Sequence, residues 1–216
     1  MRRRFAGAVV LAVCAALTAC AGDKEISVGE ARPEARKVGI AWKPRQAVNP
    51  AQWPNACDLV SSKEIKAILP QGKLGQPWSQ RVVVEPSDSV GPGGTGRAAN
   101  GQCTYMVELS HRSGKAMYRV NQLSIRIEGV GDPALVTKFF ARTKKNEQSP
   151  EEDNGVDIPG TDACFVHDTS KLEPRSVVCR RGPLMFTVST GTWNVDTVVT
   201  QTRIIPAVIQ TVAAKV

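Results

Sequence analysis

The chain has 216 residues, a length that fits one or two domains. Hydrophobic residues make up 42% and charged residues 22% of it, so most of the chain can bury a core and disorder throughout is excluded. The formal net charge is +8, and with only two histidines any site that needs several histidine ligands is excluded as well.

Residues 1–20 have the pattern of a bacterial lipoprotein signal peptide. Three arginines at positions 2–4 precede an uncharged, mostly apolar run, which is shorter than the roughly 20 residues of a membrane span. The next residues, Leu17-Thr18-Ala19-Cys20, match the lipobox, in which small residues fit the signal peptidase and the cysteine thiol receives diacylglycerol. We therefore predict a signal peptide over residues 1–19 and a lipidated, palmitate-bearing Cys20 that anchors the protein at the extracytoplasmic face of the cell membrane.

Two questions about this predicted signal peptide stay open. An ordinary secretory signal could carry Cys20 by chance, and Arg2-Arg3-Arg4-Phe5 is compatible with either the general or the twin-arginine export route. In each case the protein leaves the cytoplasm, so its basic charge does not indicate a nucleic acid as partner. The charge favours proximity to anionic lipid or wall polymers, or is simply that of a solvated basic surface.

The segment after the lipobox is rich in proline and charge and shows no helical or strand period. We therefore predict that residues 20–53 form a lipidated N-terminus and flexible tether, and that residues 54–216 form a single domain. Trp42 and Trp53 are unusual in a tether, and they either dock back on the domain or contact a ligand.

Three helices are expected in the domain. Ser61 and Glu64 form a capping box that begins the first helix, which ends at Pro70. Asp132 and Pro133 are an N-cap and first-turn proline for the second. The third covers residues 195–216 and should kink at Pro206. The apolar faces of the first two helices consist of Ile65, Ile68 and Leu69, and of Leu135, Val136, Phe139 and Phe140.

The strands are indicated by alternation of apolar and polar residues. A glycine-rich loop is expected over residues 86–101, and a turn near Ser113-Gly114 would join an antiparallel pair of strands. The order of elements predicts an α+β fold, with a mainly antiparallel sheet packed by about three helices on one face, and suggests a degenerate repeat of two halves. The expected strands cover residues 81–85, 103–109, 123–127, 164–166, 177–179 and 184–188.

Four cysteines remain after the signal peptide and Cys20, and an even number outside the cytoplasm predicts disulfides in one of three connectivities. Cys164 and Cys179 lie symmetrically about an expected turn, so they can face each other across adjacent strands. Cys57 begins the first helix and Cys103 lies on a long strand, so we predict the pairs Cys57–Cys103 and Cys164–Cys179. A metal site is the rival interpretation, but no Cys-x-x-Cys spacing supports it, and no metal is predicted.

Several short motifs resemble a large family of actinobacterial lipoproteins of unknown function. Asn55-Ala56-Cys57-Asp58-Leu59-Val60-Ser61 is similar to the family's Pro-Cys-x-Leu-Leu-Thr start, and Cys103-Thr104-Tyr105 to its Cys-x-Trp strand. Gly160-Thr161-Asp162-Ala163 partly matches a Gly-x-Gly-Asp-x-Ala segment, with one glycine lost. The resemblance implies an α+β domain in the cell envelope. It carries over no catalytic residue, because the family's activity is not established.

No motif for catalysis or for a cofactor stands out. His167 and Asp168 are neighbours on an expected strand and point to opposite faces, and His111 lies near a turn. No Gly-x-Ser-x-Gly motif is present, and the glycine-rich stretch 91–96 lacks the Gly-Lys-Ser/Thr ending of a phosphate loop. We therefore predict no catalytic residue and no cofactor.

The sequence favours a non-catalytic binding or scaffolding module, whose partner is an envelope protein, a wall polymer or a small apolar ligand. Binding residues are expected in loops on a rigid scaffold, at Gly93, Gly94 and Trp193. The alternative is an extracytoplasmic hydrolase with a site assembled from distant residues around His167. A cleft that brings His167 beside an acid and a hydroxyl would favour that alternative.

Overall fold

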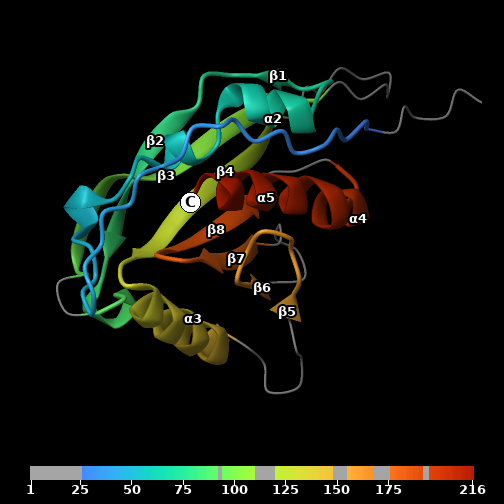
Figure 1. Cartoon of the computed structure of the whole chain (residues 1–216). Coiled ribbons are helices and arrows are strands. Elements are labelled where there is room, and N and C mark those ends of the chain that lie inside the picture. The colour runs from blue at the N-terminus through green and yellow to red at the C-terminus, as the bar shows by residue number, and fades with distance from the viewer. Residues whose placement is uncertain (1–25, 92–93, 110–119, 148–154, 168–175, 192–194) are drawn as a thin grey trace, which may run out of the picture.

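The computed structural model describes residues 26–91, 94–109, 120–147, 155–167, 176–191 and 195–216. Eight strands form one antiparallel sheet with the order β1-β3-β4-β8-β7-β6-β5, and β2 pairs with β3 beside β1 (Figure 1). This confirms the predicted α+β fold. The strands are β1 (Lys73–Leu74), β2 (Trp78–Val84), β3 (Gly96–Glu108), β4 (Val120–Val130), β5 (Gly155–Val156), β6 (Ala163–His167), β7 (Ser176–Arg181) and β8 (Leu184–Thr190).

One face of the sheet carries the larger core. It is covered by α1 (Ala56–Leu59), α2 (Ser62–Ile68) and α5 (Ile205–Lys215), whose apolar side chains pack against the alternate inward residues of the central strands. The expected alternation along two strands is confirmed, since the buried residues include Cys103, Tyr105, Val107, Leu123, Ile125 and Ile127. Strands β3 and β4 pair antiparallel as predicted, and the turn expected near residue 113 lies outside the described residues.

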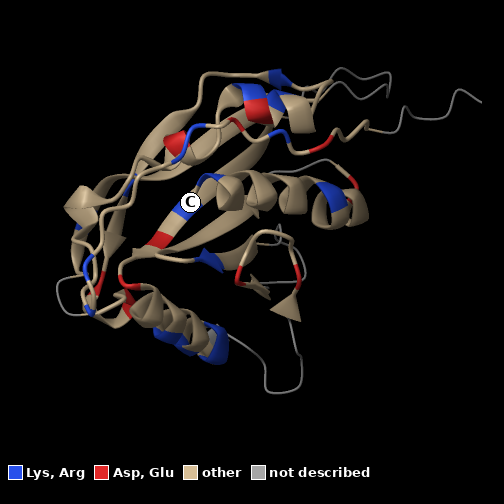
Figure 2. Ribbon diagram, viewed as in Figure 1, with Lys and Arg blue, Asp and Glu red and all other residues tan. Residues whose placement is uncertain are grey.

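The other face is only partly covered. Helix α3 (Pro133–Glu147) packs there against Phe165, Val178 and Met185, with the Phe140 ring edge-on to Phe165 at a centroid distance of 5.1 Å. The prediction that all helices lie on one face is therefore wrong. The reason is that these three strand residues make an apolar patch on the second face, which the apolar side of α3 covers. The basic residues of α3 lie mostly on its side turned away from the sheet (Figure 2).

The predicted helix caps are confirmed. The Ser61 side chain accepts a hydrogen bond from the Glu64 amide at 3.2 Å, and the Glu64 carboxylate accepts one from the Ser61 amide at 2.6 Å. Asp132 caps α3 through the Ala134 amide at 2.7 Å and also accepts from the Arg45 amide at 2.6 Å. These two backbone donors hold the pKa of the Asp132 carboxyl below its usual value.

The C-terminal helical segment is interrupted as expected. It begins with α4 (Thr197–Val199), widens into a π-helical turn η3 (Thr200–Ile204), and continues as α5, with Pro206 in its first turn. Proline cannot donate a backbone hydrogen bond, and the wider turn before it accommodates that loss. Within the described ranges, none of the helices combines the length and the apolar character required to cross a membrane.

The suggested repeat of two halves holds for strand order alone. Strands β3-β4 and β7-β8 are arranged symmetrically about the β4–β8 pair. The helices do not follow that symmetry, because α2 covers one face and α3 the other. The expected loop over residues 86–101 is also shorter than predicted. A 3₁₀ turn, η2 (Pro86–Asp88), begins it, and β3 already starts at Gly96, where its backbone pairs with Val84.

The expected tether is wrong for residues 26–53, which run along the domain and end in the 3₁₀ helix η1 (Pro50–Gln52) (Figure 1). Val28 is buried, and the amides of Gly29 and Val38 donate to the carbonyls of Ile68 and Lys215 at 2.9 and 2.8 Å. The Val48 amide adds a hydrogen bond to Val130. Scattered apolar residues anchor the segment although it has no period. Trp53 docks on the domain, with its indole N–H donating to Val48 at 3.0 Å, whereas Trp42 is 42% exposed.

Replacing Gly29 with alanine should loosen this segment. An added Cβ would lie 2.1 Å from the carbonyl oxygen of Ala67 in α2, so the backbone would have to shift. We expect a loss of about 1–3 kcal/mol in the free energy of unfolding in urea, together with faster proteolysis before residue 54. Gly39→Ala is the matched control, because nothing lies within 4 Å of its added Cβ, and its effect should stay within about 0.5 kcal/mol. Equal effects of the two substitutions would show that the segment is not seated as described.

Candidate functional site

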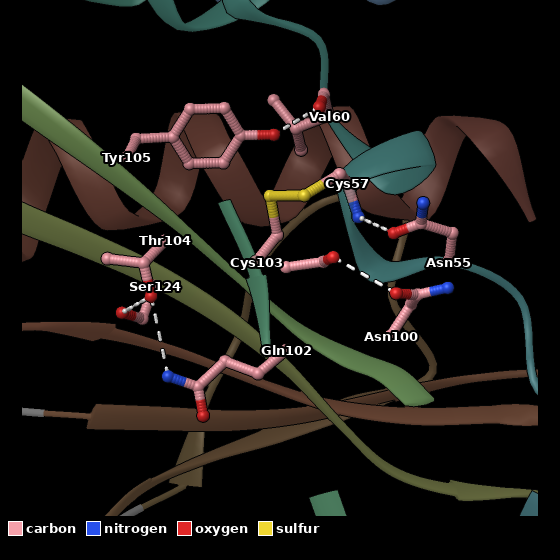
Figure 3. The surroundings of a disulfide bond; sticks show 10 residues. Asn55, Cys57, Val60, Asn100, Gln102, Cys103, Thr104, Tyr105 and Ser124 are labelled. Carbon is pink, nitrogen blue, oxygen red and sulfur yellow. Dashed lines mark hydrogen bonds between the residues drawn. A yellow bond between two sulfur atoms is a disulfide. The ribbon is translucent and has the colours of Figure 1, made fainter. Parts of the chain in front are cut away.

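The side chains of β3 divide between the two faces of the sheet (Figure 3). Cys103 and Tyr105 point to the helices, where Cys103 forms a disulfide with Cys57 and the Tyr105 hydroxyl donates to the Val60 carbonyl. Burial, with a smaller contribution from nearby carboxylates, raises the pKa of Tyr105, so the phenol stays protonated. Gln102 and Thr104 point to the opposite face, where α3 leaves part of the sheet uncovered.

A line of polar side chains crosses this second face from strand to strand. Backbone partners in an antiparallel ladder place their side chains on the same face. Five residues on five strands are successive backbone partners along this line: His167, Ser176, Ser189, Ser124 and Thr104. We call these five residues the hydroxyl row.

A second polar line lies beside the hydroxyl row. Thr187, Arg126 and Gln102 are successive partners on β8, β4 and β3. The Thr187 hydroxyl donates to Glu128 at 2.7 Å, and the Arg126 Nε lies 3.4 Å from the other oxygen of that carboxylate. The lines are linked where the Gln102 amide donates to Thr104 at 3.4 Å.

Helix α3 and the turn η2 convert this polar surface into a groove of about 570 Å³. Arg142 holds the two walls together, because its guanidinium donates to the carbonyls of Ser87 and Ser89 at 3.1 and 2.9 Å and lies 5.1 Å from the centre of the Phe139 ring. The groove floor comes from both polar lines. Its walls include Ser87, Asp88, Arg142, Thr143 and Asn146.

The structure brings one of the residues singled out in the sequence to this groove. His167 lines it at the β6 end of the hydroxyl row. Gly94 is buried, with its amide donating to Gly91 at 2.9 Å, and does not line the groove. Gly93, Trp193 and His111 lie outside the described residues, as does Cys20.

Both predicted disulfides are present. Cys57 is joined to Cys103, which ties α1 to β3, and Cys164 is joined to Cys179 across directly paired positions of β6 and β7. The four cysteines thus form the two pairs that the sequence predicts. The described parts of the chain hold no cluster of three or more histidine, cysteine or acidic side chains that could bind a metal ion.

The groove residues of β3, β4 and β8 were missed in the sequence, although a signal for them exists. In β4 the polar residues Ser124, Arg126 and Glu128 occupy the positions between the buried Leu123, Ile125 and Ile127. Alternation shows that such residues share a face. Only strand order shows that they continue the polar positions of β3 and β8.

Comparison with known proteins adds no relative: no protein-family model matches the chain, and neither a curated protein nor a solved structure matches it significantly. The resemblance to actinobacterial lipoproteins therefore stays a prediction that rests on the motifs around Cys57, Cys103 and Gly160.

Proposed function

We propose that this protein is a membrane-anchored envelope lipoprotein that acts as a non-catalytic binding module, with the groove beside α3 as its ligand site. The observation that carries the proposal is the groove itself, in which two polar lines on the sheet are walled by α3 and η2. A solvated sheet face is ordinary in antiparallel folds. This groove differs from an ordinary solvated face, because walls enclose it and hydrogen bonds hold the donors and acceptors of its floor in fixed positions.

The alternative hydrolase is supported by one observation, the position of His167 directly opposite Ser176 in the groove. The register argues against a catalytic triad with Glu128. Strands β7 and β8 lie between β6 and β4, which separates the two residues by about 14 Å at the usual strand spacing. The Ser176 hydroxyl, moreover, donates to the backbone carbonyl of His167 at 3.3 Å. These contacts favour binding over nucleophilic catalysis.

A photo-crosslinking amino acid at Ser189, in the middle of the hydroxyl row, tests the proposal in membranes of the producing cells. The matched control carries the same group at Lys63 on α2, whose side chain is 86% exposed on the opposite side of the sheet. We expect an adduct from position 189 that is absent from position 63. Equal labelling at the two positions, or no adduct at position 189, would reject the groove as a ligand site. Hydrolytic loss of a trapped ligand that stops with His167→Ala would favour the hydrolase.

The packed N-terminal segment alters how the proposed anchor holds the domain. With residues 26–53 on the domain, only the steps from Cys20 to Ile26 separate the lipid from the folded part. Six residues span at most about 22 Å when extended. The domain is therefore held close to the membrane surface, rather than being lifted from it by a long tether.

Replacing Cys20 with alanine tests the anchor. The lipobox chemistry requires the thiol, so Cys20→Ala should leave the precursor unprocessed or release the protein from the membrane fraction. The measurement is membrane fractionation together with the mass of the mature N-terminal peptide. Normal processing and membrane retention of Cys20→Ala, with no acyl mass on the wild-type peptide, would exclude a lipid anchor at this residue.

A further inference from the structure

The hydroxyl row continues onto an exposed aromatic side chain. Trp78 on β2 is the direct backbone partner of Thr104, so its indole lies on the groove side of the sheet. It is 38% exposed, although large aromatic residues usually bury most of their surface. From His167 to Trp78 the line crosses six strands, which corresponds to about 24 Å at the usual strand spacing.

The chemistry along this line is mainly that of neutral groups that both donate and accept. Ser176, Ser189 and Ser124 are half-buried hydroxyls, and the half-buried Gln102 adds a carboxamide. Thr104 is 2% exposed and bonds to the Ser124 hydroxyl at 3.0 Å, so it positions its neighbour rather than contacting a ligand. The indole of Trp78 offers a flat apolar surface at the end of the line.

The two arginines that line the groove are already engaged. Arg126 faces the Glu128 carboxylate, and Arg142 donates to two backbone carbonyls. A phosphate or carboxylate ligand would have to compete with these contacts. A sugar would not, because its hydroxyls can both donate to and accept from serine and carboxamide groups, while the apolar C–H face of its ring can stack on an indole.

We propose that the groove binds a neutral, linear saccharide chain, which lies across the strands with one sugar ring stacked on Trp78. This inference deepens the proposed function and rests on it. The length of the polar line favours a chain over a single sugar, because the line continues past the residues that line the groove to Ser124, Thr104 and Trp78. Within a cell envelope such a ligand belongs to the chemical class of wall polysaccharides.

Titration of the folded mature domain with cellohexaose, maltohexaose and chitohexaose tests this proposal, with calorimetry as the readout. We expect at least one of these chains to bind, and Trp78→Ala to weaken that binding by about tenfold or more, because buried aromatic contacts carry a large share of binding free energy. Gln102→Ala should weaken it by a smaller factor. Trp42→Ala is the matched control, since this indole is similarly exposed at 42% but lies on the N-terminal segment, and it should leave the affinity unchanged.

The possible outcomes separate the saccharide from the broader function. Failure of all three chains to bind at millimolar concentration, with circular dichroism showing a folded domain, would overturn the saccharide proposal. Equal weakening by Trp78→Ala and Trp42→Ala would overturn the placement of the sugar. If no sugar binds but the crosslink at position 189 captures a protein, the proposed binding function is supported and the saccharide proposal is rejected. If neither experiment captures a ligand, both proposals fall.

Discussion

Replacing Lys215 with methionine is expected to lower the free energy of unfolding at pH 7 by about 3–5 kcal/mol. The Lys215 ammonium lies 2.6 Å from the Glu64 carboxylate, and the two side chains are only 2% and 1% exposed. The variant leaves the carboxylate buried without its counter-charge. The same carboxylate also accepts hydrogen bonds from the Glu34 and Ser61 amides, so the change affects the N-terminal segment and the cap of α2 together.

The loss should depend on pH in a defined direction. Burial by itself raises the pKa of the Glu64 carboxyl, but hydrogen bonds from Lys215 and from the Glu34 and Ser61 amides, with the Lys215 charge, leave that pKa below its usual value. A lowered folded-state pKa contributes stability that is present above about pH 4.5 and is lost as pH falls through the folded-state value. In Lys215→Met the pKa should rise instead, so acidification should narrow the difference between the two proteins.

Urea unfolding at pH 7 and at about pH 4 measures both the loss and its pH dependence. Lys63→Met is the matched control, because Lys63 pairs with Glu34 at 3.9 Å with its side chain 86% exposed, and it should cost less than about 1 kcal/mol. The double variant Glu64→Gln with Lys215→Met should recover part of the loss. A decrease no larger than that of Lys63→Met would show that the Glu64–Lys215 pair does not contribute as a buried pair.

Removing the Cys57–Cys103 disulfide is expected to cost about 4 kcal/mol of unfolding free energy, since it closes a loop with a sequence separation of 46. The same loop-entropy relation gives about 3 kcal/mol for Cys164–Cys179, with its separation of 15. The four-residue helix α1 should suffer most from the first change, because a helix of that length has little stability without tertiary contacts.

Guanidinium unfolding of the paired alanine variants under non-oxidising conditions checks the order of the two effects. Cys164→Ala with Cys179→Ala is the internal control, because β6 and β7 stay paired through five backbone partners without the disulfide. A larger loss for the Cys164–Cys179 variant than for the Cys57–Cys103 variant would contradict the argument. Native stabilities of about 5–15 kcal/mol make either loss readily measurable.

The sequence by itself determined the elements whose signals lie within a few neighbouring residues. The capping box of Ser61 and Glu64, the Asp132-Pro133 helix start, and the alternation in β3 and β4 are local because they depend on backbone hydrogen bonds or side-chain direction within one element. The disulfide pairs followed from those elements. Since the Cys164 and Cys179 strands pair antiparallel, the two residues meet in register.

The path of residues 26–53 was decided by tertiary structure. An extended segment has no period of its own and is held here by partners far along the chain, such as Ile68, Val130 and Lys215. A high content of proline and charge indicates that a segment is extended, but it does not show whether the folded domain offers a surface on which the segment can pack. The position of α3 is similar, because its amphipathic pattern fits either face until Phe165, Val178 and Met185 make one of them apolar.

The groove also depends on strand order. In β3, β4 and β8 the sequence shows that alternate residues are polar, and this indicates a common face within each strand. Only the order β3-β4-β8-β7-β6 joins those faces, bringing Ser124, Ser189, Ser176 and His167 into one line from four separate strands. Local chemistry thus determined the caps of α2 and α3, the alternation in β3 and β4, and the disulfides, whereas the site arose from long-range pairing that no single stretch encodes.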